Sequence, residues 1–330
     1  IAMVAEKKTE AEITAEMLKK YSDITEAAVK ECLEDVAALT EAKKLFTLIG
    51  EEVDEAFDRN VQASLMNHEM IQRMGDKLNI VYTPLHGSGN MPVRRNLEKA
   101  GFKNVYIVKE QEEPDSSFST VDYPNPEDVK VFVMAQELAA KVDADVLIGT
   151  DPDADRVGAM VKDSNGEFVA LTGNHVGALA TEYILSQRKA QGKLPANGAV
   201  IKTIVSTEMI TPICEAYGVE KMDVLTGFKF IGEKIKGFEE TGSHEYLYGF
   251  EESYGCLGGT YARDKDAVYA AVLICEMAAY YKEKGMTLYE ALLALYEKYG
   301  YYREGVKSLT MKGLEGMERI ALIMKTFREN

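Results

Sequence analysis

The chain has 330 residues, of which 46% are hydrophobic and 28% are charged, so it has globular composition and enough length for about two domains. Its 54 acidic residues outnumber 38 basic residues and give a formal net charge of -16, which argues against nucleic acid or anionic membranes as partners. No apolar run has membrane-spanning length and the four cysteines form no CxxC pair, so we expect a soluble, cytoplasmic protein without a disulfide framework or zinc site.

Residues 1 to about 50 contain no proline, and their apolar residues stand three or four positions apart among alanine, glutamate and lysine. This spacing predicts helices. A better-defined amphipathic helix is expected from about Gly50 to Met66, because its apolar residues fall on one face.

From residue 78 onward, short apolar runs alternate with helical patterns. The strands expected in the first series are 78–82, 105–108 and the run ending at Gly149, and the helices are 92–100 and about 127–142. The strands expected in the second series are 199–205, 222–226 and 246–249, and the helices are about 173–188, 265–284 and 287–299. This repetition predicts two consecutive α/β/α sandwich domains with mainly parallel or mixed sheets and a boundary near residue 172.

The stretch GTDPDADRVG follows a predicted strand directly and places Asp151, Asp153 and Asp155 at alternate positions ahead of Arg156. Ligands of open α/β sheets bind at the carboxyl ends of the strands. Two like charges about 4 Å apart cost on the order of 4 kcal/mol near a protein surface, and a divalent cation reverses that cost. Carboxylate oxygens suit Mg²⁺ or Mn²⁺, although the spacing is not that of an EF-hand, and a solvated turn without a metal stays open as the alternative.

The stretch YGFEESYG ends another apolar run. Glu251 and Ser253 alternate there, so both side chains can face one side and bind neighbouring hydroxyl groups of a ligand. An edge strand with its polar side chains turned outward is the alternative interpretation.

Basic residues stand near the ends of the second series of strands: Lys202 in VIKTIV, Lys229 in TGFKFIG, and Arg263 and Lys265 in YARDKDA. A lysine inside an apolar strand, such as Lys202, is costly unless it has a partner or an anionic ligand. The turn before a predicted helix offers backbone N–H groups to phosphate. A surface salt bridge explains each residue taken alone, but their recurrence at consecutive strand ends favours an anion site.

Taken in order, the motifs TPLHGSGN, PDSSFSTVDYPNPE, DPDADR, TGFKFIGEKI and FEESYG…ARDKDA resemble those of the α-D-phosphohexomutase superfamily. They are most similar to bacterial phosphoglucomutases of the phosphoglucomutase/phosphomannomutase family, from about residue 50 to the end. The resemblance implies the middle of a four-domain isomerase. Residues 53–172 would form a metal-binding domain and 173–300 a sugar-binding domain, while 1–52 would be a remnant and linker from an absent first domain and 301–330 a linker toward an absent fourth.

The resemblance also implies roles for individual residues. Asp151, Asp153 and Asp155 would hold Mg²⁺, and Arg156 would lie beside the transferred phosphoryl group. Lys265 takes the position of a general base or a phosphate contact. The substrate-binding candidates, from the resemblance and the strand-end positions together, are Lys202, Thr226, Lys229, Glu251, Ser253 and Arg263.

The implied reaction interconverts glucose 1-phosphate and glucose 6-phosphate through a phosphoserine enzyme and glucose 1,6-bisphosphate. The sequence has no serine followed by His-Asn-Pro, the family's phosphoryl-carrying loop, and no Arg-x-Ser-Gly-Thr-Glu phosphate loop. We therefore expect this polypeptide alone to be inactive. Phosphomannomutase or phosphopentomutase activity of the parent protein remains an alternative, as does a non-catalytic module that binds sugar phosphates.

Overall fold

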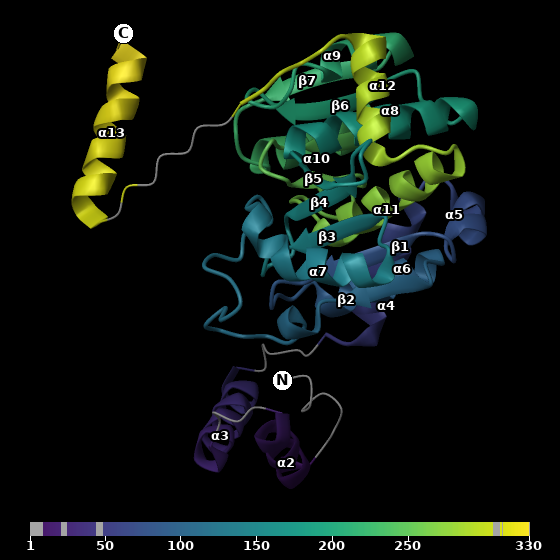
Figure 1. Ribbon diagram of the computed structural model, residues 1–330. Helices are drawn as coiled ribbons and strands as arrows, with labels where there is room; N and C mark the ends of the chain where they lie inside the picture. Colours follow the sequence, from purple (N-terminus) through teal and green to yellow (C-terminus); the bar gives the residue numbers. More distant parts are fainter. Residues whose placement is uncertain (1–8, 21–24, 44–48, 306–310, 312, 330) are drawn as a thin grey trace.

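The computed structural model describes residues 9–20, 25–43, 49–305, 311 and 313–329. Two mixed β-sheets with helices on their faces make up its body (Figure 1). This architecture confirms the predicted α/β/α class. None of the helices in the described part of the chain has the length and apolar character needed to cross a bilayer.

The first sheet has the strand order β2-β1-β3-β4-β5. Its first three strands are parallel, whereas β4 runs antiparallel to both β3 and β5. The strands are β1 (Asn79–Thr83), β2 (Asn104–Ile107), β3 (Val146–Thr150), β4 (Val157–Lys162) and β5 (Phe168–Leu171). The helices of this part are α4 (Glu51–Ala63), α5 (His68–Met74), α6 (Asn90–Ala100) and α7 (Val133–Val142), with short 3-10 helices at Lys109–Gln111 and Val129–Phe132.

The second sheet has the order β7-β6-β8-β9, with β7, β6 and β8 parallel and β9 antiparallel. Its strands are β6 (Gly198–Thr203), β7 (Glu220–Val224), β8 (Glu245–Phe250) and β9 (Cys256–Leu257). The helices are α8 (Gly173–Ala190), α9 (Ile210–Tyr217), α10 (Lys229–Thr241), α11 (Ala267–Glu283) and α12 (Leu288–Tyr299).

Strand alternation separates the two faces of each sheet. In β1, Ile80 and Tyr82 belong to one buried cluster, and Val81 between them belongs to another that includes the apolar side chains of α7. Likewise, the apolar side chains of α10 pack on one face of the second sheet and form a separate buried cluster with it. Side chains that alternate between faces in this way give each sheet two apolar layers.

Helix α11 joins the two halves into one core. It is buried continuously from Ala267 to Ala279, and it packs against α5, α6, β3 and β4 of the first half as well as α8, α12 and β9 of the second. A helix that is apolar on all sides has to be covered on all sides. One buried cluster therefore runs through both halves, so the two expected domains share a core.

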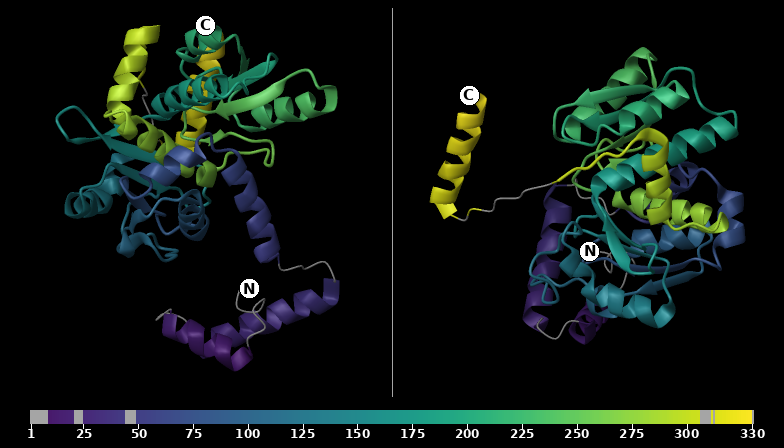
Figure 2. Two further views of the ribbon diagram at one scale, coloured as in Figure 1. Left: turned by 90° about the vertical axis from the view of Figure 1, so that its right-hand side faces the viewer. Right: turned by 45° about the horizontal axis from the view of Figure 1, so that its top comes forward.

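Several elements differ from expectation. The hairpin of β4 and β5 and the short strand β9 are not among the strands expected from the sequence. The helices expected in residues 1 to about 50 are present as α2 (Glu10–Lys20) and α3 (Glu26–Lys43), whereas the end of the chain contains α13 (Gly313–Glu329), which lies apart from both sheets (Figure 2). The pattern of residues 301–312 also predicts a strand-like piece, but residues 306–310 and 312 lie outside the described part of the chain.

Candidate functional site

The aspartate loop joins two neighbouring strands, because β3 ends at Thr150 and β4 begins at Val157. Asp151 is fully buried, and its Oδ1 accepts hydrogen bonds from the backbone N–H groups of Asp155 at 3.0 Å and Arg156 at 2.9 Å. Its Oδ2 accepts a third bond, of 2.7 Å, from Nε of Arg156. The loop is therefore wound around the Asp151 carboxylate.

The three aspartates converge as the sequence predicts. One carboxylate oxygen from each of Asp151, Asp153 and Asp155 lies within 4.8 Å of the others. Burial raises the pKa of Asp151 to about 6, with a further contribution from the charge of Asp155, while hydrogen bonds from Arg156 act in the opposite direction. A donor set made only of carboxylate oxygens fits a hard divalent cation such as Mg²⁺ or Mn²⁺.

The aspartate loop also contacts the second half of the chain. Oδ2 of Asp155 lies 3.0 Å from Nζ of Lys265, in the loop that leads into α11. Two backbone hydrogen bonds reinforce the junction: the N–H of Ala267 donates to the carbonyl of Ala154, and the N–H of Val157 donates to the carbonyl of Tyr254. The DPDADR and ARDKDA motifs therefore meet at one edge of the fold.

Lys265 is held as a cation. Burial acts to lower the pKa of its ammonium, but hydrogen bonds to Asp264 and Asp155 and the charges of both carboxylates outweigh it, so the pKa is raised. Nζ also lies 5.7 Å from the centroid of the Phe228 ring. A lysine whose pKa is raised is a poor general base at neutral pH, so of the two roles considered for Lys265 this setting favours a phosphate contact.

Glu251 follows β8 directly and is 6% exposed. Its Oε1 accepts a hydrogen bond of 2.9 Å from the backbone N–H of Gly227, which joins the FEES and TGF stretches. Gly227 has a φ of 117°, a conformation that L side chains rarely adopt. Burial raises the pKa of Glu251, whereas the Gly227 N–H and the charge of Lys265 oppose the rise.

Ser253 is half-buried, and its hydroxyl makes no hydrogen bond to any described residue. Thr226 and Lys229 are exposed just before and at the start of α10, where Nζ of Lys229 lies 5.1 Å from the centroid of the Phe230 ring. These three side chains are thus open to a ligand. Glu252, which stands between Glu251 and Ser253, is instead tied to the end of β6, because its Oε2 accepts a 2.8 Å bond from the Thr203 hydroxyl.

Two of the expected substrate contacts are occupied by the protein itself. Lys202 is fully buried, and its Nζ lies 2.9 Å from Glu208 and 3.0 Å from Asp223. Arg263 is exposed but donates to Glu239 and, at 2.6 Å, to the Thr260 carbonyl. Internal carboxylates thus offset the cost of placing Lys202 in a strand.

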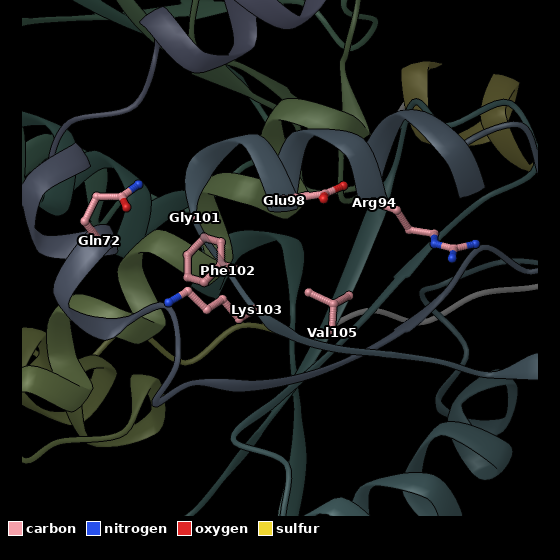
Figure 3. Close-up of a pocket in the computed structure, with 7 residues that line it drawn as sticks. All are labelled: Gln72, Arg94, Glu98, Gly101, Phe102, Lys103 and Val105. Carbon is pink, nitrogen blue, oxygen red and sulfur yellow. The ribbon is translucent and has the colours of Figure 1, made fainter.

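Two cavities lie in the first half of the chain. One of about 440 Å³ opens beside Asp153 and Arg156, with walls from Phe118, Tyr123 and Pro152. Another of about 450 Å³ lies beside the amino end of β2 (Figure 3). Its lining residues are Gln72, Arg94, Glu98, Gly101, Phe102, Lys103 and Val105, and it contains no residue of the candidate site.

Comparison with protein families agrees with this arrangement. Residues 56–166 match phosphoglucomutase/phosphomannomutase α/β/α domain II, and residues 172–299 match α/β/α domain III of the same proteins. The chain belongs to the phosphoglucomutase/phosphomannomutase family. Its aspartate loop lies in the domain II match, and Thr226, Lys229, Glu251, Ser253 and Lys265 lie in the domain III match.

Individual relatives of this family member extend the comparison. A phosphoglucomutase of Staphylococcus aureus is 38% identical over 279 residues, which cover 83% of this chain and 49% of that protein. The chain thus spans about half the length of the curated relatives it matches. A Thermus thermophilus structure described as a phosphomannomutase shares the fold with a TM-score of 0.60 at 23% identity, covering 75% of this chain and 51% of that one. A Burkholderia thailandensis family member has a TM-score of 0.50 at 20% identity, covering 75% and 53%.

Proposed function

We propose that this chain supplies the metal-binding and sugar-binding parts of a phosphoglucomutase active site. The observation that carries the proposal is the 3.0 Å contact between Asp155 and Lys265, because it brings the aspartate loop and the loops around Glu251 to the same edge. A site that handles a sugar phosphate needs charge neutralisation and hydroxyl recognition next to each other. These loops offer both.

Asp151, Asp153 and Asp155 would hold Mg²⁺, which when bound would neutralise charge on a phosphoryl group. Arg156, anchored by Asp151, presents a fixed cation beside them. Lys265 adds a second cation whose pKa is raised, so it stays protonated at neutral pH. In phosphoryl transfer, catalysis comes mostly from such positioning and charge stabilisation.

Glu251 and Ser253 would bind sugar hydroxyls, and Thr226 and Lys229 would contact the substrate near the amino end of α10. The Glu251 carboxylate has one oxygen bound to Gly227, which orients the other. Lys202 is not included because its ammonium already has internal partners. We assign glucose 1-phosphate, glucose 6-phosphate and glucose 1,6-bisphosphate as ligands, supported by the phosphoglucomutase relative at 38% identity.

A binding experiment tests the proposal. We would load the chain with Mn²⁺ and follow glucose 1,6-bisphosphate by ³¹P NMR, since a paramagnetic ion at the aspartates broadens a phosphate signal that lies close to it. We expect broadening that Mg²⁺ reverses and that is lost when Glu251→Gln and Ser253→Ala are combined. Unchanged ³¹P line widths with the metal demonstrably bound would remove the sugar-phosphate assignment.

Turnover is a separate question. Because no serine in the sequence precedes His-Asn-Pro, we expect no conversion of glucose 1-phosphate to glucose 6-phosphate by this chain, even with glucose 1,6-bisphosphate as primer. A coupled assay for glucose 6-phosphate measures this directly, and sustained turnover would show that another residue carries the phosphoryl group.

A further inference from the structure

The Asn-Pro-Glu stretch at 125–127 has no role so far, yet it reaches the aspartate loop. Oε1 of Glu127 lies 3.1 Å from Nη1 of Arg156, whose Nε binds Oδ2 of Asp151 at 2.7 Å. The guanidinium thus bridges two carboxylates, one in the candidate metal site and one outside it. Two charge-assisted bonds from different nitrogens fix the orientation of its plane.

The residues around Glu127 are arranged to hold it in place. The Asn125 side chain accepts a 3.0 Å hydrogen bond from the backbone N–H of Glu127. The Pro126 carbonyl lies against Gly158 of β4, where an added Cβ would come within 2.4 Å of that oxygen. After it, the Asp128 side chain caps the 3-10 helix by accepting from the N–H of Lys130. The stretch is therefore seated on the strand that follows the aspartate loop.

We propose that Glu127 is a positioning residue that keeps Nη1 of Arg156 turned away from Asp155, while Nε remains on Asp151. Without Glu127, Nη1 would lose its acceptor. Asp155 offers another acceptor, because its Oδ1 already lies 3.7 Å from Nε of Arg156. A guanidinium turned toward the aspartates would compete with a divalent cation for the same oxygens. The inference rests on the proposed function, because it concerns the metal held by that site.

The test measures Mn²⁺ affinity by electron paramagnetic resonance and the Nε–H signal of Arg156 by ¹H–¹⁵N NMR, both on the whole chain. Glu127→Ala is expected to weaken Mn²⁺ binding about fivefold to tenfold and to shift or broaden the Arg156 signal. Glu127→Gln keeps a hydrogen-bond acceptor, so its Mn²⁺ affinity and its Arg156 signal should both lie between those of Glu127→Ala and those of the unmodified chain. The matched control is Glu110→Ala, which removes an equal charge from an exposed side chain of the same half that has no hydrogen bond or ion pair among the described residues.

Repeating the Glu127→Ala measurement in an Arg156→Gln variant separates an effect on the orientation of Arg156 from the simple loss of the Glu127 charge. When Arg156→Gln is already present, Glu127→Ala should change Mn²⁺ affinity less than twofold. Equal effects of Glu127→Ala in both backgrounds, or an unchanged Arg156 signal, would overturn the proposal. Failure of the unmodified chain to bind Mn²⁺ would instead remove the proposed metal site, and the Arg156 signal would still decide whether Glu127 orients the guanidinium.

Discussion

Asp155 and Lys265 form the ion pair that joins the two halves of the site, with 3.0 Å between Oδ2 and Nζ. Asp155 follows β3 and Lys265 precedes α11, so the contact joins two segments that are far apart in the sequence. Lys265 also acts on Glu251: burial raises the pKa of the Glu251 carboxyl, and the positive charge of Lys265 opposes that rise. A single ammonium therefore connects the aspartate loop with the FEES loop.

Lys265→Ala should separate metal binding from sugar-phosphate binding. We expect affinity for glucose 1,6-bisphosphate to fall about tenfold, since hydrogen bonds to charged groups contribute roughly 1.5–3 kcal/mol. Mn²⁺ affinity should stay the same or rise, because a competing cation has left Asp155. Calorimetric titrations with each ligand measure both effects. Parallel loss of the two affinities would contradict independent roles for the two loops.

Asp153→Asn should weaken Mn²⁺ binding at least tenfold while leaving the fold intact, because Asp153 is the exposed member of the three aspartates. Asp151→Asn should behave differently. Its carboxylate accepts three hydrogen bonds within the loop, so we expect a loss of about 1–3 kcal/mol in the free energy of unfolding as well. Urea titration beside metal titration distinguishes the two variants, and wild-type Mn²⁺ affinity in Asp153→Asn would show that the aspartates do not bind the metal together.

Lys202→Met tests whether the buried lysine serves the fold or the ligand. Removing it takes the Nζ donor from the carbonyls of Thr203 and Ser206, two buried residues, so we expect a loss of about 1–3 kcal/mol in the free energy of unfolding. Lys221→Met is the matched control, because Lys221 pairs with the same two carboxylates as Lys202 from a more exposed position and should cost less than about 1 kcal/mol. Full stability of Lys202→Met together with lost sugar-phosphate binding would restore the substrate role.

Glu276 should make stability depend on pH. Burial raises its pKa to about 7, although hydrogen bonds from Asn67, Tyr183 and Met66 oppose this. Because the folded protein holds the proton more tightly than the unfolded chain, the stabilisation is complete below the unfolded pKa and is lost as pH rises toward 7. The change amounts to about 3 kcal/mol at 1.4 kcal/mol per pKa unit.

Urea unfolding between pH 4.5 and 8 measures this effect of Glu276. Stability should decline across the interval and level off above pH 7, and Glu276→Gln should flatten the decline. The substitution keeps the shape of the side chain and removes only the titration. An identical pH profile in the variant would mean that another group is responsible.

Much of the fold follows from local pattern. The strands before Asp151 and Glu251 are short apolar runs, and the convergence of the three aspartates follows from their alternate spacing after a strand end. The hairpin of β4 and β5 is harder to recognise from the sequence. It becomes part of the sheet because β4 pairs with β3, and that pairing depends on the tertiary structure. Its first strand provides Gly158, on which the Asn-Pro-Glu stretch rests.

Local pattern predicts most of the segments that become strands and helices and the loops that carry the charges, because periodicity and turn chemistry act over a few neighbouring residues. The local pattern does not show that Lys202 faces internal carboxylates, that Glu127 reaches Arg156, or that α11 is buried between the two halves. These outcomes depend on contacts between distant segments. A buried charge has to find its partner wherever the packing of the core places one.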